Sequence, residues 1–359
     1  MKQAKLKSVL WLPFILLITS LFCISNAYAT SAKKREINSR FPINKGDLLR
    51  MNCSYGNLTV SHWDKDEITI QVFIECKADN DRIAQRILDN IQININKSNN
   101  VIDVSTFFKK QNENNSSIYK IINFNIQMPN YIDANVDWKY GNIYLPKVNN
   151  GNININLKYG NIKAGSFSKP LTINAKYSNL EVENLTSAVF DLAYMGNTSI
   201  ESAQRLNVND KYSSMNVNEA EEMSAAIKYS NLKINRIKTL EANAQYSNIT
   251  ISKAEASLII SMLSYGNLRV NELSSNFSKV NINAKYSDID LSISRKAEFN
   301  LSATQMKYAN CKINGFNITQ SKTDEQDNSY FYEINHGQKA SINFNGNNYT
   351  DIRINAITK

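Results

Sequence analysis

Apolar and polar residues alternate through most of this chain, in short segments that recur. Ile173, Ala175 and Tyr177 fall on one face of an extended chain, and the polar residues between them fall on the other. The dipeptide Ser-Asn follows Tyr177, and the alternation then resumes one position out of phase at Leu180 and Val182. Because Asn and Gly tolerate left-handed backbone angles, this phase shift predicts a corner between two short strands.

The same order of tyrosine, Ser or Gly, Asn or Asp, and an apolar residue recurs along the chain. From Tyr140 to Tyr308 the copies are 17–22 residues apart. A period near 18 is too short for helical-hairpin repeats, and the residue types within it favour strands. The aligned copies, one with methionine at the tyrosine position, begin at Tyr55, Tyr140, Tyr159, Tyr177, Met195, Tyr212, Tyr229, Tyr246, Tyr265, Tyr286, Tyr308 and Tyr349.

A coil of two or three such strands cannot bury its own interior, whereas a stack of coils can. We therefore expect an all-β fold, a right-handed parallel β-helix or β-solenoid of about 10–12 coils. At about 4.8 Å per coil the rod would be roughly 50 Å long. Its tyrosines would stack inside the rod or at its corner, with an exposed platform for sugars as the alternative. This structural ladder comprises Tyr140, Tyr159, Tyr177, Tyr212, Tyr229, Tyr246, Tyr265, Tyr286 and Tyr308.

The regions on either side of the repeats read differently. We expect a flexible segment at 30–44 and a small α+β cap at 45–130, with a hairpin around His62–Glu67 and a helix at 81–91. The β-solenoid repeats would span 131–314. Irregular C-terminal coils and a closing turn would follow at 315–359, because the distance between the last two tyrosines doubles to 41 residues.

The first 29 residues have the pattern of a secretory signal peptide. Three lysines precede an apolar run, and Ala27-Tyr28-Ala29 supplies the small residues of a cleavage site. An uncleaved membrane anchor is the alternative, although the run is short for a span. Cleavage after Ala29 would lower the net charge from +9 to +6, which is not by itself the signature of a nucleic-acid-binding protein. We expect export to the periplasm, the cell surface or the extracellular space.

Three cysteines would remain in the exported chain, too few for a disulfide scaffold. Cys53 and Cys76 are equidistant from the centre of the His62–Glu67 turn. A cross-strand disulfide between them is one hypothesis, and two buried thiols are the other.

Several segments together resemble a known group of proteins. These are G-N-L-T-V-S-H-W-D-K-D-E-I-T-I from Gly56, the helical A-x-x-I-L-D-N-I, the run N-F-N-I-Q-M-P-N-Y-I-D-A-N-V, and the Y-G-N-I repeats. Over roughly residues 45–355 the chain resembles the bacterial putative-adhesin families, exported domains related to the head-GIN auto-transporter adhesin domains. The resemblance implies a β-helical fold and supplies no catalytic residue.

A column of lysines is the main candidate for function. One residue before the tyrosine, on the outer face, the repeats carry Lys139, Lys158, Lys176, Lys211, Lys228, Lys285 and Lys307. We expect gaps at Tyr194, Gln245 and Ser264. Stacked like charges repel, so a column that tolerates them could hold an extended polyanion such as an acidic polysaccharide, lipopolysaccharide or released DNA. The alternative is that lysine simply keeps a sheet face soluble.

The sequence offers little for catalysis. His62 and His336 are far apart and without metal spacing, and no nucleophile elbow, phosphate loop or paired-cysteine metal site occurs. Asp191 and Asp210 lie on consecutive repeats at positions that are apolar elsewhere, which would suit an acid–base pair, but a shifted register would place Asp191 in water.

We therefore expect a non-enzymatic, adhesin-like protein without metal or cofactor. Its partner would be a surface glycan or other polyanion, and not a specific nucleic acid. The alternatives are a structural envelope protein that binds itself or an envelope protein, and, further off, a polysaccharide-active enzyme.

Overall fold

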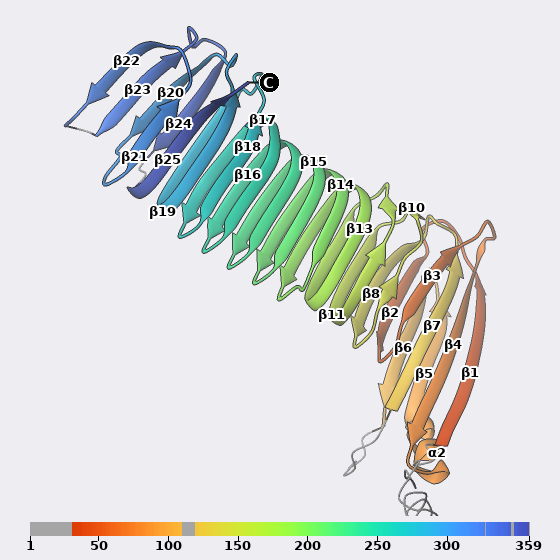
Figure 1. The fold of residues 1–359 in the computed structure, drawn as a ribbon. Helices are drawn as coiled ribbons and strands as arrows, with labels where there is room; N and C mark the ends of the chain where they lie inside the picture. The colour runs from red at the N-terminus through yellow and green to blue at the C-terminus, as the bar shows by residue number, and fades with distance from the viewer. Residues whose placement is uncertain (1–30, 110–118, 327, 346–347, 359) are drawn as a thin grey trace, which may run out of the picture.

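The computed structural model describes residues 31–109, 119–326, 328–345 and 348–358. Within these ranges the chain is all-β with one helix, and pairings join its strands into a single 25-stranded sheet. Figure 1 shows an elongated stack of strands, with the helix at the N-terminal end. No helix in the described ranges is both long and apolar enough to cross a membrane. The predicted signal peptide lies outside the described residues.

The N-terminal region combines parallel and antiparallel strands with the helix. The segment expected to be flexible is instead mostly strand β1, which pairs antiparallel with β4 along its whole length. The predicted hairpin around His62–Glu67 is wrong, because β7 lies between β3 and β4 and pairs with both. The elements are β1 (Ser31–Pro42), β2 (Leu48–Ser54), β3 (Leu58–His62), β4 (Glu67–Ala78), α2 (Asp81–Asn90), β5 (Ile91–Ser98), β6 (Val101–Phe108) and β7 (Tyr119–Met128).

The predicted helix is confirmed as α2. The side chain of Asn80 caps it by accepting a hydrogen bond of 2.9 Å from the backbone N–H of Ile83. Asp81 in the first turn interacts favourably with the positive end of the helix dipole. Ala84 and Leu88 are buried, which docks the helix on the end of the sheet.

Of the two hypotheses for Cys53 and Cys76, the structure supports two buried thiols and contradicts the disulfide. Cys53 lies on β2, which pairs with β6 and β8, whereas Cys76 lies on β4, which pairs with β1 and β7. Equal spacing about the turn would bring the two cysteines together only in a hairpin, and β7 occupies that place.

Through the middle of the chain each repeat pairs in parallel with the next. Ala193 pairs with Lys211, and Lys211 with Lys228, so strands lie over their equivalents one repeat away. The elements are β8 (Asp133–Lys139), β9 (Ile143–Tyr144), β10 (Val148–Asn149), β11 (Ile153–Ala164), β12 (Ser166–Phe167), β13 (Leu171–Ala193), β14 (Thr198–Lys211), β15 (Ser214–Lys228), β16 (Asn231–Gln245), β17 (Asn248–Ser264), β18 (Asn267–Leu273) and β19 (Lys279–Ser294).

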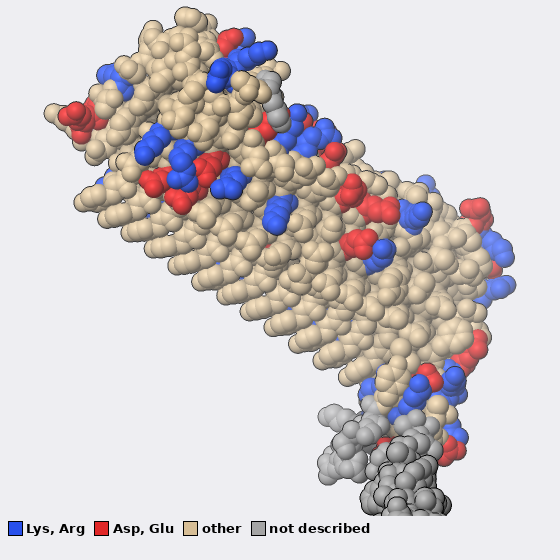
Figure 2. Space-filling view, in the orientation of Figure 1, with Lys and Arg blue, Asp and Glu red and all other residues tan. Residues whose placement is uncertain are grey.

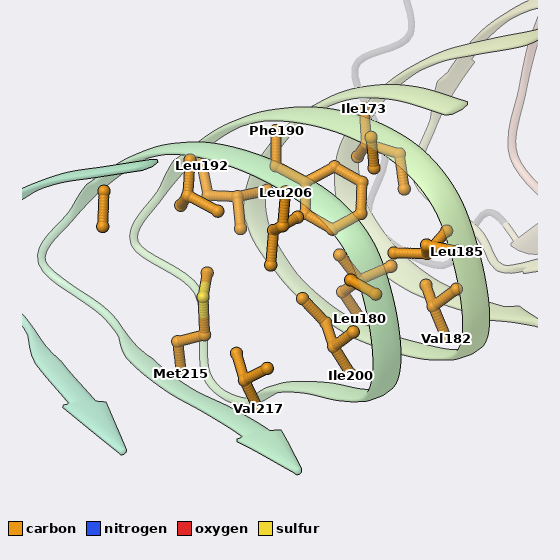
Figure 3. Packing of buried hydrophobic residues seen from close by; sticks show 14 of the residues in the cluster. Ile173, Leu180, Val182, Leu185, Phe190, Leu192, Ile200, Leu206, Met215 and Val217 are labelled. Carbon is orange, nitrogen blue, oxygen red and sulfur yellow. The ribbon is translucent and has the colours of Figure 1, made fainter. Parts of the chain in front are cut away.

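The core runs through the inside of this stack. In β13 the burial alternates along the strand, and the pattern changes phase where the chain turns at Tyr177. Figure 3 shows Leu180, Ile200 and Met215 from successive repeats pointing into the interior, where Phe190 also points. Each repeat therefore completes the apolar environment of its neighbours, which is why the motif recurs.

The C-terminal region departs from the regular repeat but is built of strands. Its elements are β20 (Phe299–Thr304), β21 (Asn310–Asn314), β22 (Ile318–Asp324), β23 (Ser329–Ile334), β24 (Ala340–Asn345) and β25 (Asn348–Ile357). β22 and β23 form an antiparallel hairpin, and β23 pairs with β20. The chain then returns: β24 pairs with both β19 and β20, and β25 with both β19 and β21. The last residues are thus inserted into the stack, and this return accounts for the doubled tyrosine spacing.

Candidate functional site

Twelve tyrosines form one continuous ladder along a corner of the stack. Neighbouring ring centroids are 4.9–5.2 Å apart and the rings lie within 21° of parallel. The spatial order follows the inserted C-terminal strand, so Tyr349 lies between Tyr286 and Tyr308. The ladder, in this order, is Tyr55, Tyr140, Tyr159, Tyr177, Tyr194, Tyr212, Tyr229, Tyr246, Tyr265, Tyr286, Tyr349 and Tyr308.

The tyrosine itself adopts the left-handed backbone conformation at each corner. All twelve have φ between 50° and 67°, whereas we expected the Ser/Gly-Asn pair that follows to absorb the turn. This conformation costs a residue with a side chain roughly 1–2 kcal/mol, and Gly or Asn would adopt it more easily. Stacking of aromatic rings contributes about 0.5–1.5 kcal/mol per pair, which offsets much of that cost. The tyrosines are therefore retained for their side chains.

In one repeat the ladder residue is Tyr194, whereas the sequence alignment had placed Met195 at that position. Tyr194 belongs to the ladder, and Met195 is a buried residue inserted after it. The insertion appears in the register, since Leu180 pairs with Thr198 although Tyr177 stacks on Tyr194. The spacing of 17 between the two tyrosines was the signal that could have identified this ladder member.

Small polar residues complete the corner. The hydroxyls of Ser178, Ser213 and Ser230 donate to carbonyls two residues earlier, over 2.8–3.1 Å. The asparagines one position further on form a second ladder: Oδ1 of Asn142 accepts hydrogen bonds from both the backbone N–H and Nδ2 of Asn161, at 3.0 and 2.7 Å. These bonds satisfy backbone groups where the strand pairing is interrupted.

The ladder presents ring edges to solvent rather than ring faces. Ten of its members are 42–51% exposed although each has a ring stacked on both faces, so the accessible part is the edge. At one end Tyr55 is covered by the edge of Phe108 and by Nζ of Lys120. At the other end Tyr308 is 69% exposed. A platform that stacks sugars on open ring faces is therefore not formed along the ladder.

The lysine column lies beside the ladder, as expected. Lys139, Lys158 and Lys176 pair in consecutive strands, as do Lys211 and Lys228. The gap between these two groups is Ala193 and not Tyr194, which follows from the corrected register. Gln245 and Ser264 interrupt the column as predicted. Lys285 pairs with Asn348, and the backbone N–H of Tyr349 donates to the carbonyl of Lys307, so one repeat separates the last two lysines.

These seven lysines differ in their partners from several other basic residues of the stack. None of the seven forms a salt bridge within the described residues. Elsewhere, Lys163 pairs with Glu181 at 3.0 Å and Lys238 with Glu221 at 3.3 Å, each with the neighbouring repeat. Figure 2 shows basic and acidic side chains gathered together in patches on one side of the molecule. The column is thus a line of uncompensated positive charge.

The aspartates considered for catalysis are not brought together. Asp191 faces outward and accepts a hydrogen bond of 3.1 Å from Asn209, while Asp210 points inward and is 1% exposed. Burial raises the pKa of Asp210, and the nearby hydroxyls of Ser213 and Ser230 offset this only in part. His62 ends β3 and His336 precedes β24, at opposite ends of the stack (Figure 1). No group of three or more metal-ligating side chains gathers in the described part of the chain.

Comparison with known proteins gives weak likenesses. No model of a protein family matches the chain, and no curated protein does. A putative cell adhesion protein from Clostridium sporogenes is 12% identical, with 90% of this chain and 100% of that one covered and a TM-score of 0.22. A putative lipid binding protein from Parabacteroides distasonis is 15% identical, with coverages of 74% and 93% and a TM-score of 0.33. A putative adhesin from Bacteroides fragilis is 10% identical, with coverages of 90% and 98% and a TM-score of 0.29. Likenesses this low carry no argument about function.

Proposed function

We propose that this chain is an exported, non-enzymatic, adhesin-like β-solenoid that binds surface glycans or other anionic polymers along its lysine column. The observation that supports this is the line of unpaired lysines on consecutive parallel strands. Three other lysines on the stack, Lys163, Lys238 and Lys253, have an acid on a neighbouring repeat, so stacked charge can be neutralised in this fold, and the column does not use this means.

The energetic reasoning favours a ligand with repeated negative charge. Like charges on adjacent strands repel by about a few tenths of a kcal/mol per pair at a solvated surface. An extended polyanion lying along the column would remove each of these repulsions and release its own counterions. Binding would therefore weaken as salt shortens the Debye length below about 8 Å. Export through the signal peptide would place the column at the periplasm, the cell surface or the extracellular space, where such polymers occur.

The test compares two variants of equal net charge. In the column variant Lys158, Lys176, Lys211 and Lys228 become Gln. In the control variant Lys163, Lys238, Lys253 and Lys339, which form salt bridges in the wild-type protein, become Gln. Retention on an array of anionic glycans is measured at low and at physiological salt. We expect salt-sensitive retention that the control keeps and the column variant loses. Equal retention by both variants would rule out the column as the binding surface.

A structural, self-assembling role in the cell envelope is the second candidate. At one end of the stack the ring of Tyr308 is exposed. Strand β21 lies at the same end and pairs with β25 alone among the described strands, so one of its edges can still form backbone hydrogen bonds. Sedimentation of the purified chain tests this role. A chain that stays monomeric at high concentration and captures no envelope protein would exclude it.

A further inference from the structure

We infer that the polymer is an acidic polysaccharide lying parallel to the rod axis, and that the hydroxyl row of the tyrosine ladder selects it over other polyanions. This inference rests on the proposed function. The lysines would attract any polyanion, and the tyrosine hydroxyls would select the polysaccharide among polyanions. An experiment can therefore contradict the selection by tyrosines and leave the binding by lysines intact.

The covered ring faces argue against single-stranded nucleic acid. Proteins that bind single strands stack bases on the open faces of aromatic side chains. Here each ring from Tyr140 to Tyr286 is sandwiched between two others at 4.9–5.2 Å, which leaves no room for a base. The exposed half of each ring is its edge, where the hydroxyl lies. The ladder therefore offers hydrogen bonds to a ligand and offers it no stacking.

The choice of tyrosine over phenylalanine also points to the hydroxyls. Phe would stack equally well and would meet the same backbone strain, yet all twelve positions are Tyr. None of these hydroxyls forms a hydrogen bond within the described residues, in contrast to the hydroxyl of Tyr131, which donates to Asp66 at 2.8 Å. A phenol hydroxyl both donates and accepts, as sugar hydroxyls and carboxylates require.

The three rows at the corner together match the chemistry of an acidic sugar polymer. Lysine ammonium groups flank the ladder on one side, and Nζ of Lys228 lies 5.4 Å from the ring centroid of Tyr229. Asparagine amides flank it on the other side, each using part of its hydrogen-bonding capacity on the next repeat, as Asn179 does with Asn161 at 2.6 Å. Carboxylates can meet the lysines, and sugar hydroxyls can meet the phenols and amides.

The lysines are dense in only one half of the column. Five of them occupy six consecutive repeats from Lys139 to Lys228, a length of about 25 Å. Beyond Lys228 only two of the next five positions are lysines, and the order is Gln245, Ser264, Lys285, Asn348 and Lys307. The polymer is therefore expected to lie over the N-terminal half of the ladder.

The experiment removes hydroxyls without disturbing the stack. In the site variant Tyr159, Tyr177, Tyr212 and Tyr229 become Phe. In the matched control Tyr265, Tyr286, Tyr349 and Tyr308, the four at the lysine-poor end, become Phe. Binding is measured by titration calorimetry at one fixed ionic strength with two probes, sodium polygalacturonate and poly(dT). Circular dichroism and thermal unfolding verify that both variants keep the fold of the wild-type chain.

We expect the site variant to bind polygalacturonate roughly tenfold more weakly or worse, since several hydrogen bonds are lost. Its binding to poly(dT), which the lysines alone attract, should hardly change, and the control should behave as wild type. Wild-type affinity of the site variant for polygalacturonate would overturn the inference while leaving the proposed function intact. Tighter binding of poly(dT) than of polygalacturonate by the wild-type chain would overturn it in favour of nucleic acid. Loss of all binding in the column lysine variant, with the tyrosine variant unaffected, would assign recognition to charge alone.

Discussion

Asp210 is out of place in the core, and replacing it should stabilise the protein. It lies in an inward column whose other members are apolar side chains or a thiol. It pairs with Leu192 on one side and Ile227 on the other. Its side chain is 1% exposed, and neither carboxyl oxygen accepts a hydrogen bond, because the nearby hydroxyls of Ser213 and Ser230 donate to backbone carbonyls instead. The column runs Cys53, Trp138, Leu157, Ala175, Leu192, Asp210, Ile227, Ala244, Leu263 and Ala284.

Asp210→Leu should raise the free energy of unfolding by about 2–5 kcal/mol at neutral pH. A buried polar group without a partner costs about 1–3 kcal/mol in proteins. Burying a leucine side chain contributes about 1.5–3 kcal/mol, and crowding against Leu192 and Ile227 removes part of that gain. Asp210→Asn keeps the size of the side chain and removes only its ionisation.

The gain should depend on pH in a defined direction. Burial raises the pKa of Asp210 above its ordinary value, so the folded chain holds this proton more tightly than the unfolded chain does. The corresponding stability is fully present below the unfolded pKa and is lost as the pH rises through the folded pKa. The advantage of Asp210→Leu should therefore be smallest near pH 4 and should grow toward pH 7.

Urea unfolding followed by circular dichroism, at a series of pH values, measures both effects. The Asn variant should lose the pH-dependent part and keep most of the cost of an unpaired polar group. An Asp210→Leu chain no more stable than wild type at pH 7 would refute the reasoning. So would an advantage that shrinks as the pH rises, because the folded chain would then lower the pKa of Asp210 by stabilising its carboxylate.

Three further outcomes follow from the corners and the core. Tyr212→Ala should lower the melting temperature more than Tyr212→Gly, since both remove two stacking contacts and only glycine relieves the left-handed strain of about 1–2 kcal/mol; the reverse order in thermal unfolding would contradict this account. Gly160→Ala should prevent the native stack from forming, because its Cβ would lie 1.8 Å from the carbonyl oxygen of Gly141, and a native-like melting curve would show that the repeats can shift apart. Cys53 and Cys76 should react with a thiol reagent only as fast as the chain unfolds, because burial raises their pKa values to about 12 and about 11, and rapid labelling of the folded chain would show that this core opens.

The repeat determined what could be predicted from the sequence. Regular spacing and alternation are local signals, so the parallel stacking of repeats and the outward position of the lysines could be predicted. The pairing of Lys158 with Lys176 is an example. Two features could not be predicted. The place of β7 between β3 and β4, and the return of β25 between β19 and β21, depend on contacts between segments far apart in the chain, and no local pattern encodes them.

The tyrosine corner illustrates a different limit. Gly and Asn adopt the left-handed backbone conformation more easily than other residues, so Asn179, two residues after Tyr177, was the expected place for the turn. Tyr177 takes the strained conformation instead, because stacking with its neighbours makes this favourable only once many repeats are assembled. Met195 was assigned to the tyrosine position for a separate reason. It is an extra residue, and the Gly-Asn pair that follows it matches the motif at the usual spacing.

The inserted strand β25 also determines the order in which parts of the stack can fold. The chain is synthesised from its N-terminus, and the proposed export would deliver it in the same order, so repeats that stack on their predecessors can form first. The repeat of Tyr308 cannot do so, because the layer beneath it is made by Asn348–Ile357, which follow it by about 40 residues in the chain. Assembly of this layer must therefore wait until Asn348–Ile357 have also been delivered. A product that ends before Asn348 would lack these pairings of β19 and β21, a form that quality-control proteases can distinguish from a chain that carries β25.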